Sequence, residues 1–328
     1  MKKIEPSLQN VGRAVTSIDL WGGNTDILSA SLRCHPGAVR SENQDRVGAE
    51  KTSHSTFVLV ADGVGGDGGG GQAAEIARTE YIRSLKSSGS AIQPAEALKL
   101  ATRAVNARIE ECRRSGPAAF NKMSSTVALV LLQDNVAYIG HLGDSRVYRA
   151  REDGLMCLTR DHSVVRTMIE KGIISEAQAE NHPSSHILTH SLGQVDVELE
   201  VSSHALATDD VFLLCSDGLW AYVPEAAIYG VLAERPLQTA VAADTLLRSA
   251  LDAGAPDNVS IAVLRIYDRE RKKVQEKAVK TERKGISRRA WIWITALLLL
   301  ALIATFYFVY SYEFEQRHPA PIRSGTPS

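Results

Sequence analysis

Short apolar runs alternate along the chain with longer segments in which apolar positions recur at helical spacing. Runs that are rich in Val, Ile, Leu and Tyr and bounded by Asp, Asn or Gly are typical of β-strands. Such runs predict strands at residues 55–62, 124–132, 135–143, 146–152, 210–218 and 258–267. Apolar positions repeating every three to four residues predict helices at residues 71–85, 94–114, 164–171, 224–232 and 239–253.

The strands between residues 124 and 152 follow one another through short turns. Asp134-Asn135 and Asp144-Ser145 occupy these turns. Connections this short join antiparallel neighbours, because parallel strands need a long crossover. Strands come in runs and helices in pairs, which is the order of the α+β class. We therefore expect antiparallel sheets with helices packed on their outer faces.

The C-terminal part of the chain has a different composition. Residues 290–312 include no charged side chain, and a helix of that length reaches across the roughly 30 Å hydrocarbon core of a bilayer. Trp291 and Trp293 at one end and three tyrosines at the other resemble interfacial aromatic belts. These features predict one transmembrane helix. The alternative, a buried core helix, would need a partner domain, and only sixteen residues follow.

Basic residues gather just before this apolar segment. Ten Lys or Arg and three Glu lie between Arg269 and Arg289, whereas Arg317 and Arg323 are the only Lys or Arg residues after Tyr312. By the positive-inside rule, the large N-terminal part stays on the cytoplasmic side of the plasma (inner) membrane. We expect a lead-in at 1–27, a folded domain at 28–267, a basic juxtamembrane linker at 268–289, a transmembrane helix at 290–312 and a short extracytoplasmic tail at 313–328.

Bulk composition excludes several classes of protein. The 328 residues are 44% hydrophobic, enough for a sizeable core, and the net charge of −1 gives no reason to expect a nucleic-acid partner. Cys34, Cys112, Cys157 and Cys215 form no CxxC pair, which argues against a zinc site or a disulfide framework. We expect reduced thiols, and we expect the nine histidines to be ordinary surface or core residues.

A glycine-rich loop follows the apolar run that ends at Ala61. Seven glycines fall between Gly63 and Gly71, and Gly63, Gly65 and Gly68 satisfy GxGxxG. That spacing brings a backbone close to a dinucleotide pyrophosphate, so a nucleotide site is one hypothesis. It is disfavoured because no repeated βαβ units and no Gly-Lys-Ser/Thr sequence accompany the loop.

Aspartates stand where several predicted strands begin or end. Asp62-Gly63 and Asp217-Gly218 each follow an apolar run, Asp257-Asn258 opens the last strand, and Asp45 closes the sequence RSENQD. Crowding these carboxylates together without a cation would be costly, because like charges raise one another's pKa. Oxygen ligands with no nearby Cys or His select hard cations such as Mg²⁺ or Mn²⁺.

Eight sequence blocks in consistent order now show a resemblance to a known family. The blocks are VRSENQD, VADGVGG, SSTVALVLL, AYIGHLGDSRVY, LTRDHSVV, HPSSHILTHSLG, LLCSDGLW and PDNVSIAVL, spread over roughly 240 residues. They resemble the metal-dependent serine/threonine protein phosphatases of the protein phosphatase 2C type, in their bacterial form. The resemblance implies a central β-sandwich flanked by helices, with a two-metal site at one end.

The same resemblance implies roles for individual residues. It implies that two Mn²⁺ or Mg²⁺ ions are bound by the carboxylates of Asp45, Asp62, Asp217 and Asp257 and by the Gly63 carbonyl. It also implies that Asp144 is a ligand for a third ion and that Arg40 binds the phosphate. A water held by two metals would be the nucleophile on phosphorus.

The implied function is hydrolysis of phosphoserine and phosphothreonine in proteins, opposing a Ser/Thr kinase at a membrane. Asp67 and Gln72 near the glycine loop depart from the usual family pattern, as does His190, where an arginine is common. Val64 stands where some eukaryotic relatives carry a histidine. The alternative is a binding module that keeps the fold without the activity. Its mark would be disabling changes at the aspartates, and none is present.

Overall fold

The computed structural model describes residues 16–21, 28–66, 69–89, 91–179 and 182–267. These residues all belong to one unit of the chain, Met1–Arg269. The predicted transmembrane helix, its basic linker, the C-terminal tail and most of the lead-in lie outside the described residues. Within the described ranges, no helix combines the length and the apolar character that crossing a membrane requires.

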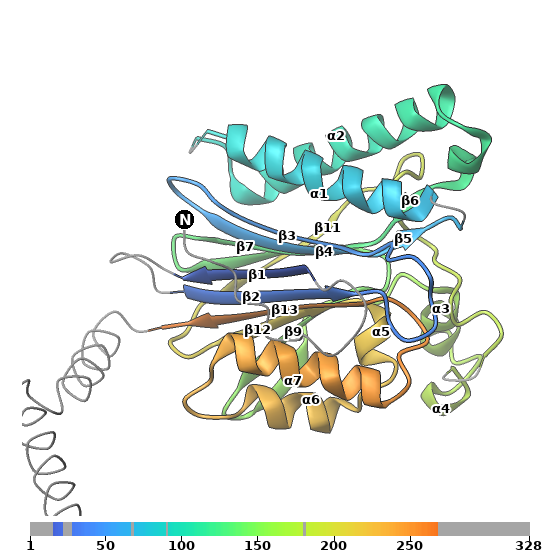
Figure 1. Cartoon of the computed structure of the whole chain (residues 1–328). Coiled ribbons are helices and arrows are strands. Elements are labelled where there is room, and N and C mark those ends of the chain that lie inside the picture. Colours follow the sequence, from blue (N-terminus) through green and yellow to red (C-terminus); the bar gives the residue numbers. More distant parts are fainter. Residues whose placement is uncertain (1–15, 22–27, 67–68, 90, 180–181, 268–328) are drawn as a thin grey trace, which may run out of the picture. The chain divides into compact units, whose positions relative to one another are not determined.

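Two antiparallel sheets form the centre of this unit (Figure 1). Within the described part of the chain, one sheet has six strands in the order β1-β2-β13-β12-β9-β10, with bounds Thr16–Trp21, Leu28–His35, Val259–Ile266, Val211–Cys215, Arg146–Arg151 and Gly154–Cys157. The other has five strands in the order β11-β8-β7-β4-β3, with bounds Glu200–Ala205, Val136–Leu142, Val127–Gln133, Thr56–Ala61 and Arg46–Lys51. A short pair, β5 (Gly63–Val64) and β6 (Ser124–Ser125), lies beyond β4 and β7.

Helices cover the outer face of each sheet. Helices α1 (Gly69–Ser87) and α2 (Pro94–Ser115) lie over the five-stranded sheet, and α6 (Glu225–Leu232) and α7 (Thr239–Asp252) lie under the six-stranded one (Figure 1). Three shorter helices, α3 (Val164–Glu170), α4 (Glu176–Ala179) and α5 (Asp217–Trp220), and a 3₁₀ turn at Ala118–Lys122 complete the described elements. The predicted α+β class and antiparallel sheets are confirmed.

Apolar side chains fill the three spaces between these four layers. One cluster, with Leu32, Val60 and Phe212, lies between the two sheets. A second packs α1 and α2 against the five-stranded sheet, and a third packs α6 and α7 against the other. Burying both faces of each sheet explains why the strand sequences read as continuous apolar runs rather than as strict alternation.

Strand β2 was not among the predicted strands, although apolar and polar positions alternate along it as is typical of a strand. Ser29, Ser31 and Arg33 are all buried. The Ser29 and Ser31 hydroxyls lie 2.7 and 3.0 Å from the Thr239 hydroxyl, and Arg33 Nε donates to Asp244 Oδ1 at 2.6 Å. Helix α7 therefore satisfies the polar face of β2, a pairing between segments about two hundred residues apart that local pattern cannot reveal.

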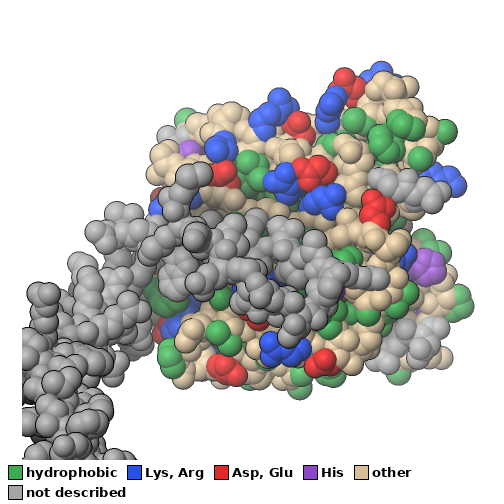
Figure 2. All heavy atoms as spheres, in the orientation of Figure 1, with side chains coloured by type: hydrophobic (Ala, Val, Ile, Leu, Met, Phe, Trp, Pro, Cys, Tyr) green, Lys and Arg blue, Asp and Glu red, His purple; other side chains and the backbone are tan. Residues whose placement is uncertain are grey.

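The surface over α1 carries charges of both signs. Glu75 pairs with Arg46 and with Arg78, and Glu80 pairs with Arg83. Figure 2 shows basic and acidic side chains next to one another on this face. The positive charges seen there are therefore offset locally rather than gathered into one patch.

Candidate functional site

Strand register brings particular strand ends together at one end of the sandwich. In the five-stranded sheet, Arg46 at the start of β3 pairs with Ala61 at the end of β4. In the six-stranded sheet, Cys215 at the end of β12 pairs with Arg146 at the start of β9. The turn between β8 and β9 connects the two sheets at this end, so residues that leave these strands lie close together.

Five aspartates occupy these positions. Each stands just before or just after one of the converging strands, at the end of the sandwich where Figure 1 shows β5 and α5. Asp45 precedes β3, Asp62 follows β4, Asp144 lies in the β8–β9 turn, Asp217 begins α5 and Asp257 precedes β13. The structure thus brings together all five aspartates that the sequence indicated.

Mutual repulsion among these carboxylates is large. Burial and the charges of Asp45 and Asp217 raise the pKa of Asp62 well above its ordinary value. Burial and the charges of Asp144 and Asp257 do the same to the pKa of Asp217. The negative charges of these aspartates therefore repel one another, and the cluster is stabilised by binding either protons or a multivalent cation.

Asp45 is the most deeply buried member of the cluster, with 1% of its surface exposed. Its Oδ2 accepts a 2.8 Å hydrogen bond from Ser216 Oγ. Its Oδ1 is buried without a hydrogen-bond partner among the described residues. Burial raises the pKa of Asp45 to about 6, against the lowering effect of Ser216.

Asp144 lies in a turn that is held by an aromatic side chain. Trp220 Nε1 donates to the Asp144 carbonyl at 3.0 Å, and the Arg146 guanidinium lies 3.6 Å from the centre of a Trp220 ring. Arg146 in turn binds both oxygens of Asp161, at 2.9 and 2.7 Å. Burial, followed by the charge of Asp161, raises the pKa of Asp144 to about 7.

The glycines after Asp62 let two backbone segments approach closely. A Cβ added at Gly63 would lie 2.2 Å from the Gly70 carbonyl oxygen and 2.7 Å from the Gln44 carbonyl oxygen. Gly65 and Gly66 have φ of 144° and 60°, a region that side chains disfavour. These glycines therefore serve a tight return of the chain into α1 beside Asp62. Asp67, in the same loop, lies outside the described residues.

Buried hydroxyls fix the backbone of Asp62. The Asp62 amide donates to Thr126 Oγ1 at 3.0 Å, and the Thr126 amide donates to the Asp62 carbonyl at 2.8 Å. Ser125 Oγ also donates to that carbonyl, at 2.9 Å. Because the backbone is held by three hydrogen bonds, the carboxylate keeps its position toward Asp45 and Asp217.

Arg40 lies at the rim of the cluster. Its Nη2 donates to Asp257 Oδ2 at 2.7 Å, while 59% of its side chain is exposed. Asn258 fixes the loop that carries Arg40 by donating to the Pro36 and Glu42 carbonyls at 3.0 and 2.9 Å. A guanidinium in this place can reach a ligand that approaches the aspartates from solvent.

The donor set fits hard divalent cations. It consists of carboxylate oxygens, the ligands that Mg²⁺ and Mn²⁺ prefer. The unpartnered Asp45 Oδ1 and the raised pKa values of its neighbours are what a site built for positive charge would show. The carboxylates of Asp45, Asp62, Asp217 and Asp257 offer such ligands, and Asp144 lies beside them.

The sequence did not indicate the residues that hold the aspartates in place. These supports are Ser216, Thr126, Asn258, Trp220 and Arg146. Their signal is weak because the group that each one bonds depends on the tertiary fold, and some of them lie next to a more conspicuous residue. Ser216 and Asn258, for example, adjoin Asp217 and Asp257. A buried polar residue beside a predicted ligand is the feature that could have identified them.

Comparison with known proteins identifies the family of this chain. A family model described as protein phosphatase 2C matches residues 38–252. The serine/threonine phosphatase stp of Listeria innocua is 32% identical over 244 residues, which cover 72% of this chain and 95% of that protein. The serine/threonine protein phosphatase PstP of Mycobacterium tuberculosis is 30% identical over 246 residues, which cover 74% of this chain and 46% of that protein.

Solved structures give the same relationship. The Mycobacterium tuberculosis phosphatase PstP/Ppp matches with a TM-score of 0.67 at 28% identity, covering 74% of this chain and 99% of that one. The catalytic domain of PstP in complex with two manganese ions matches with a TM-score of 0.66 at 28% identity, with the same coverage. The chain therefore belongs to the protein phosphatase 2C family of metal-dependent serine/threonine phosphatases.

Proposed function

We propose that the aspartate cluster is the active site, where the chain hydrolyses phosphoserine and phosphothreonine in proteins with two Mn²⁺ or Mg²⁺ ions. The observation that carries this proposal is the convergence of five carboxylates from both sheets around a buried, unpartnered Asp45 Oδ1. Such an arrangement is stable only when it gains positive charge.

The proposed ligands are Asp45, Asp62, Asp217, Asp257 and the Gly63 carbonyl, with Asp144 as a ligand for a third ion. When bound, the cations would supply Lewis acidity at the phosphoryl oxygens and would lower the pKa of a water molecule, making it a better nucleophile. The protein's own contribution is to fix the carboxylates before the ions arrive. Ser216 orients Asp45, and the backbone hydrogen bonds of Thr126 fix Asp62.

Arg40 is the proposed phosphate-binding residue. A guanidinium forms two parallel hydrogen bonds to phosphate oxygens, which positions the phosphoryl group as well as offsetting its charge. The ion pair with Asp257 keeps Arg40 at the rim of the cluster until substrate arrives. Its exposed side chain can then turn toward a phosphorylated residue of a protein substrate.

The cellular role that we propose follows from the chemistry and from the C-terminal composition. Phosphoserine and phosphothreonine in proteins are products of protein kinases, so this phosphatase opposes a Ser/Thr kinase. The apolar segment 290–312 and the basic run before it support tethering to the plasma (inner) membrane, with the catalytic domain in the cytoplasm. The short tail at 313–328 would then lie on the other side.

Phosphate release by the purified full chain tests the enzymatic part of this proposal. A phosphothreonine peptide and the matched phosphotyrosine peptide are incubated with Mn²⁺, with Mg²⁺ or with chelator. We expect turnover of the phosphothreonine peptide that requires a divalent ion and exceeds turnover of the phosphotyrosine peptide. A folded chain that hydrolyses neither peptide with either ion would instead indicate a binding module.

Cell fractionation tests the membrane part separately. The full chain should sediment with membranes, and a chain that ends at residue 267 should remain in the supernatant while keeping phosphatase activity. Equal distribution of the two chains would exclude the proposed tether, whatever their activity.

A further inference from the structure

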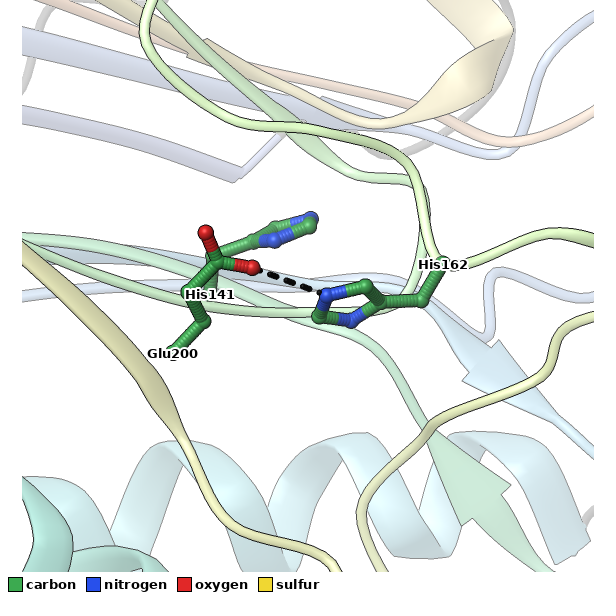
Figure 3. Close-up of side chains that lie close together, drawn as sticks. All are labelled: His141, His162 and Glu200. Atoms are coloured by element: carbon green, nitrogen blue, oxygen red, sulfur yellow. Dashed lines mark hydrogen bonds and ion pairs between the residues drawn. The ribbon is translucent and has the colours of Figure 1, made fainter. Parts of the chain in front are cut away.

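A second group of metal-ligating side chains lies outside the set of aspartates. His141, His162 and Glu200 each place one ligand atom within 4.8 Å of the others (Figure 3). In the close-up, the His162 ring points toward the Glu200 carboxylate, and the His141 ring lies beside both. We call these three residues the histidine cluster.

The fold fixes two members of the histidine cluster by strand pairing. His141 near the end of β8 pairs directly with Glu200 at the start of β11. Directly paired residues on antiparallel strands project their side chains to the same face of a sheet, with Cβ atoms about 5 Å apart. The His141 imidazole and the Glu200 carboxylate are therefore neighbours by register, not by a chance rotamer.

The third member is held by the backbone of the β8–β9 turn. The His162 amide donates to the Gly143 carbonyl at 2.7 Å, and the Gly143 amide lies 3.3 Å from His162 Nδ1. His162 Nε2 lies 3.0 Å from Glu200 Oε2. A third imidazole, that of His190, lies edge-on with its centre 4.9 Å from the His162 ring.

His141 is a polar side chain without a compensating partner. It is 2% exposed, and neither of its ring nitrogens has a hydrogen-bond partner among the described residues. The backbones of Gly143 and Ser145 act to raise the pKa of His141, but neither of them makes a hydrogen bond with the ring. A buried polar group left unpaired costs about 1–3 kcal/mol, so such a group calls for a ligand or another explanation.

Both imidazoles of the cluster are in the form that binds metals. Burial and the neighbouring His162 lower the pKa of His141 to about 3. Burial also lowers the pKa of His162, against the effect of Glu200. At neutral pH, therefore, both rings are uncharged, and each can bind a metal through one nitrogen while its single proton occupies the other.

We propose that His141, His162 and Glu200 form a separate binding site for a borderline transition cation such as Zn²⁺. Two imidazole nitrogens and one carboxylate oxygen are a common zinc donor set, with the fourth position left for water or another ligand. The aspartates offer only oxygen and suit harder ions. The chain thus carries two metal sites of different chemistry.

Binding at His162 has a structural consequence. The cation replaces the proton between Nε2 and Glu200, so the ring proton moves to Nδ1, and the 3.3 Å contact with the Gly143 amide opens. That contact is already at the long end for a hydrogen bond, which keeps the loss small. Occupancy of the histidine cluster therefore acts on the turn that carries Asp144.

Equilibrium dialysis of the full chain against Zn²⁺ in a large excess of Mg²⁺ tests the proposal. Mg²⁺ fills oxygen sites but competes poorly for imidazole. We expect a zinc ion that Mg²⁺ does not displace. Co²⁺ in its place should give the visible absorption of a four-coordinate site, which an oxygen-only octahedral site lacks.

Two variants remove ligands, and each has a matched control. Glu200→Gln and His162→Ala should weaken zinc binding by at least tenfold, because even residues that only support a ligand cost about 10–100-fold when lost. Glu198→Gln and His186→Ala make the same chemical changes at exposed residues outside the cluster and should bind zinc as wild type does.

The Glu200 side chain is 56% exposed, so Glu200→Gln should fold even if His162→Ala does not. Undiminished zinc affinity in Glu200→Gln would overturn the proposal, as would a wild-type chain that binds no zinc in excess Mg²⁺. Because the readout is bound metal, neither result depends on phosphatase activity.

Discussion

Ser216 Oγ donates a 2.8 Å hydrogen bond to Asp45 Oδ2, joining the two sheets at the end of the sandwich that holds the aspartates. Ser216 follows β12 of one sheet, and Asp45 precedes β3 of the other. Ser216 Oγ also accepts a 3.0 Å hydrogen bond from the buried Ser260 amide. One hydroxyl therefore connects the core of the six-stranded sheet to the most buried carboxylate of the proposed active site.

Replacing this hydroxyl should affect both folding and metal use. In Ser216→Ala the buried Ser260 amide loses its partner, which should cost about 1–3 kcal/mol in the free energy of unfolding. Asp45 loses its orienting bond, which should raise the Mn²⁺ concentration for half-maximal activity by about 10–100-fold. Urea unfolding and activity titrations measure the two effects. Ser203→Ala, at an exposed position of β11, is the control.

Arg40→Lys keeps the positive charge but loses the planar guanidinium group. We expect kcat/KM for a phosphothreonine peptide to fall by about tenfold or more, because an ammonium group cannot form the paired hydrogen bonds to phosphate. Mn²⁺ affinity should change little. Arg103→Ala removes an exposed arginine of α2 and should leave kcat/KM unchanged. Wild-type kinetics in Arg40→Lys would contradict the proposed phosphate-binding role.

Two glycine substitutions within helices should have opposite signs. A Cβ at Gly70 would lie 2.6 Å from the Gly63 carbonyl oxygen, whereas a Cβ at Gly230 would meet nothing within 4 Å. Gly70→Ala should therefore destabilise the fold by about 1–3 kcal/mol through overpacking. Gly230→Ala should stabilise it by up to about 1 kcal/mol through helix propensity. Thermal unfolding of both variants measures this difference, and equal shifts would exclude the close approach at Gly63.

Without metal, the protein should lose stability as pH rises. The folded-state pKa values of Asp45 and Asp144, about 6 and about 7, exceed the value of about 3.9 for an unfolded chain. Their contribution is therefore fully present below about pH 4 and is lost as pH rises through 6 and 7. Urea unfolding in chelator at pH 5 and pH 8 should show this loss, and Asp144→Asn should show less of it. Saturating Mn²⁺ should remove the decline.

Much of the proposed active site was predictable because its residues stand at strand ends. Asp62 follows an apolar run directly and Asp217 follows one after a single serine, and antiparallel pairing then brings such strand ends together. Helices α1, α2 and α7 were also predictable, because each presents a continuous apolar face to a sheet. Local pattern determines these features, so a single sequence is enough to predict them.

Pairings between distant segments were not predictable in the same way. Ser216 and Asp45 are 171 positions apart, and the sequence around either residue does not indicate that it bonds the other. The buried polar residues of strand β2 bond side chains of α7, about two hundred positions away in the sequence. The histidines were expected to be ordinary residues, yet register places His141 opposite Glu200. Each of these features depends on the tertiary fold rather than on local sequence.

Asp217→Asn tests the central claim most directly. This substitution removes one charge from the cluster without changing side-chain size, and Asp252→Asn makes the same change at an exposed site on α7. Phosphate release from a phosphothreonine peptide in saturating Mn²⁺ is measured for both variants, alongside unfolding in chelator.

We predict that Asp217→Asn is at least as stable as wild type in chelator, because the charge of Asp217 raises the pKa of Asp62. Its turnover should nevertheless fall by about a thousandfold, since metal stabilisation of the transition state is worth several kcal/mol. Asp252→Asn should retain wild-type turnover. A folded Asp217→Asn protein with wild-type turnover would contradict the assignment of the aspartate cluster as the active site.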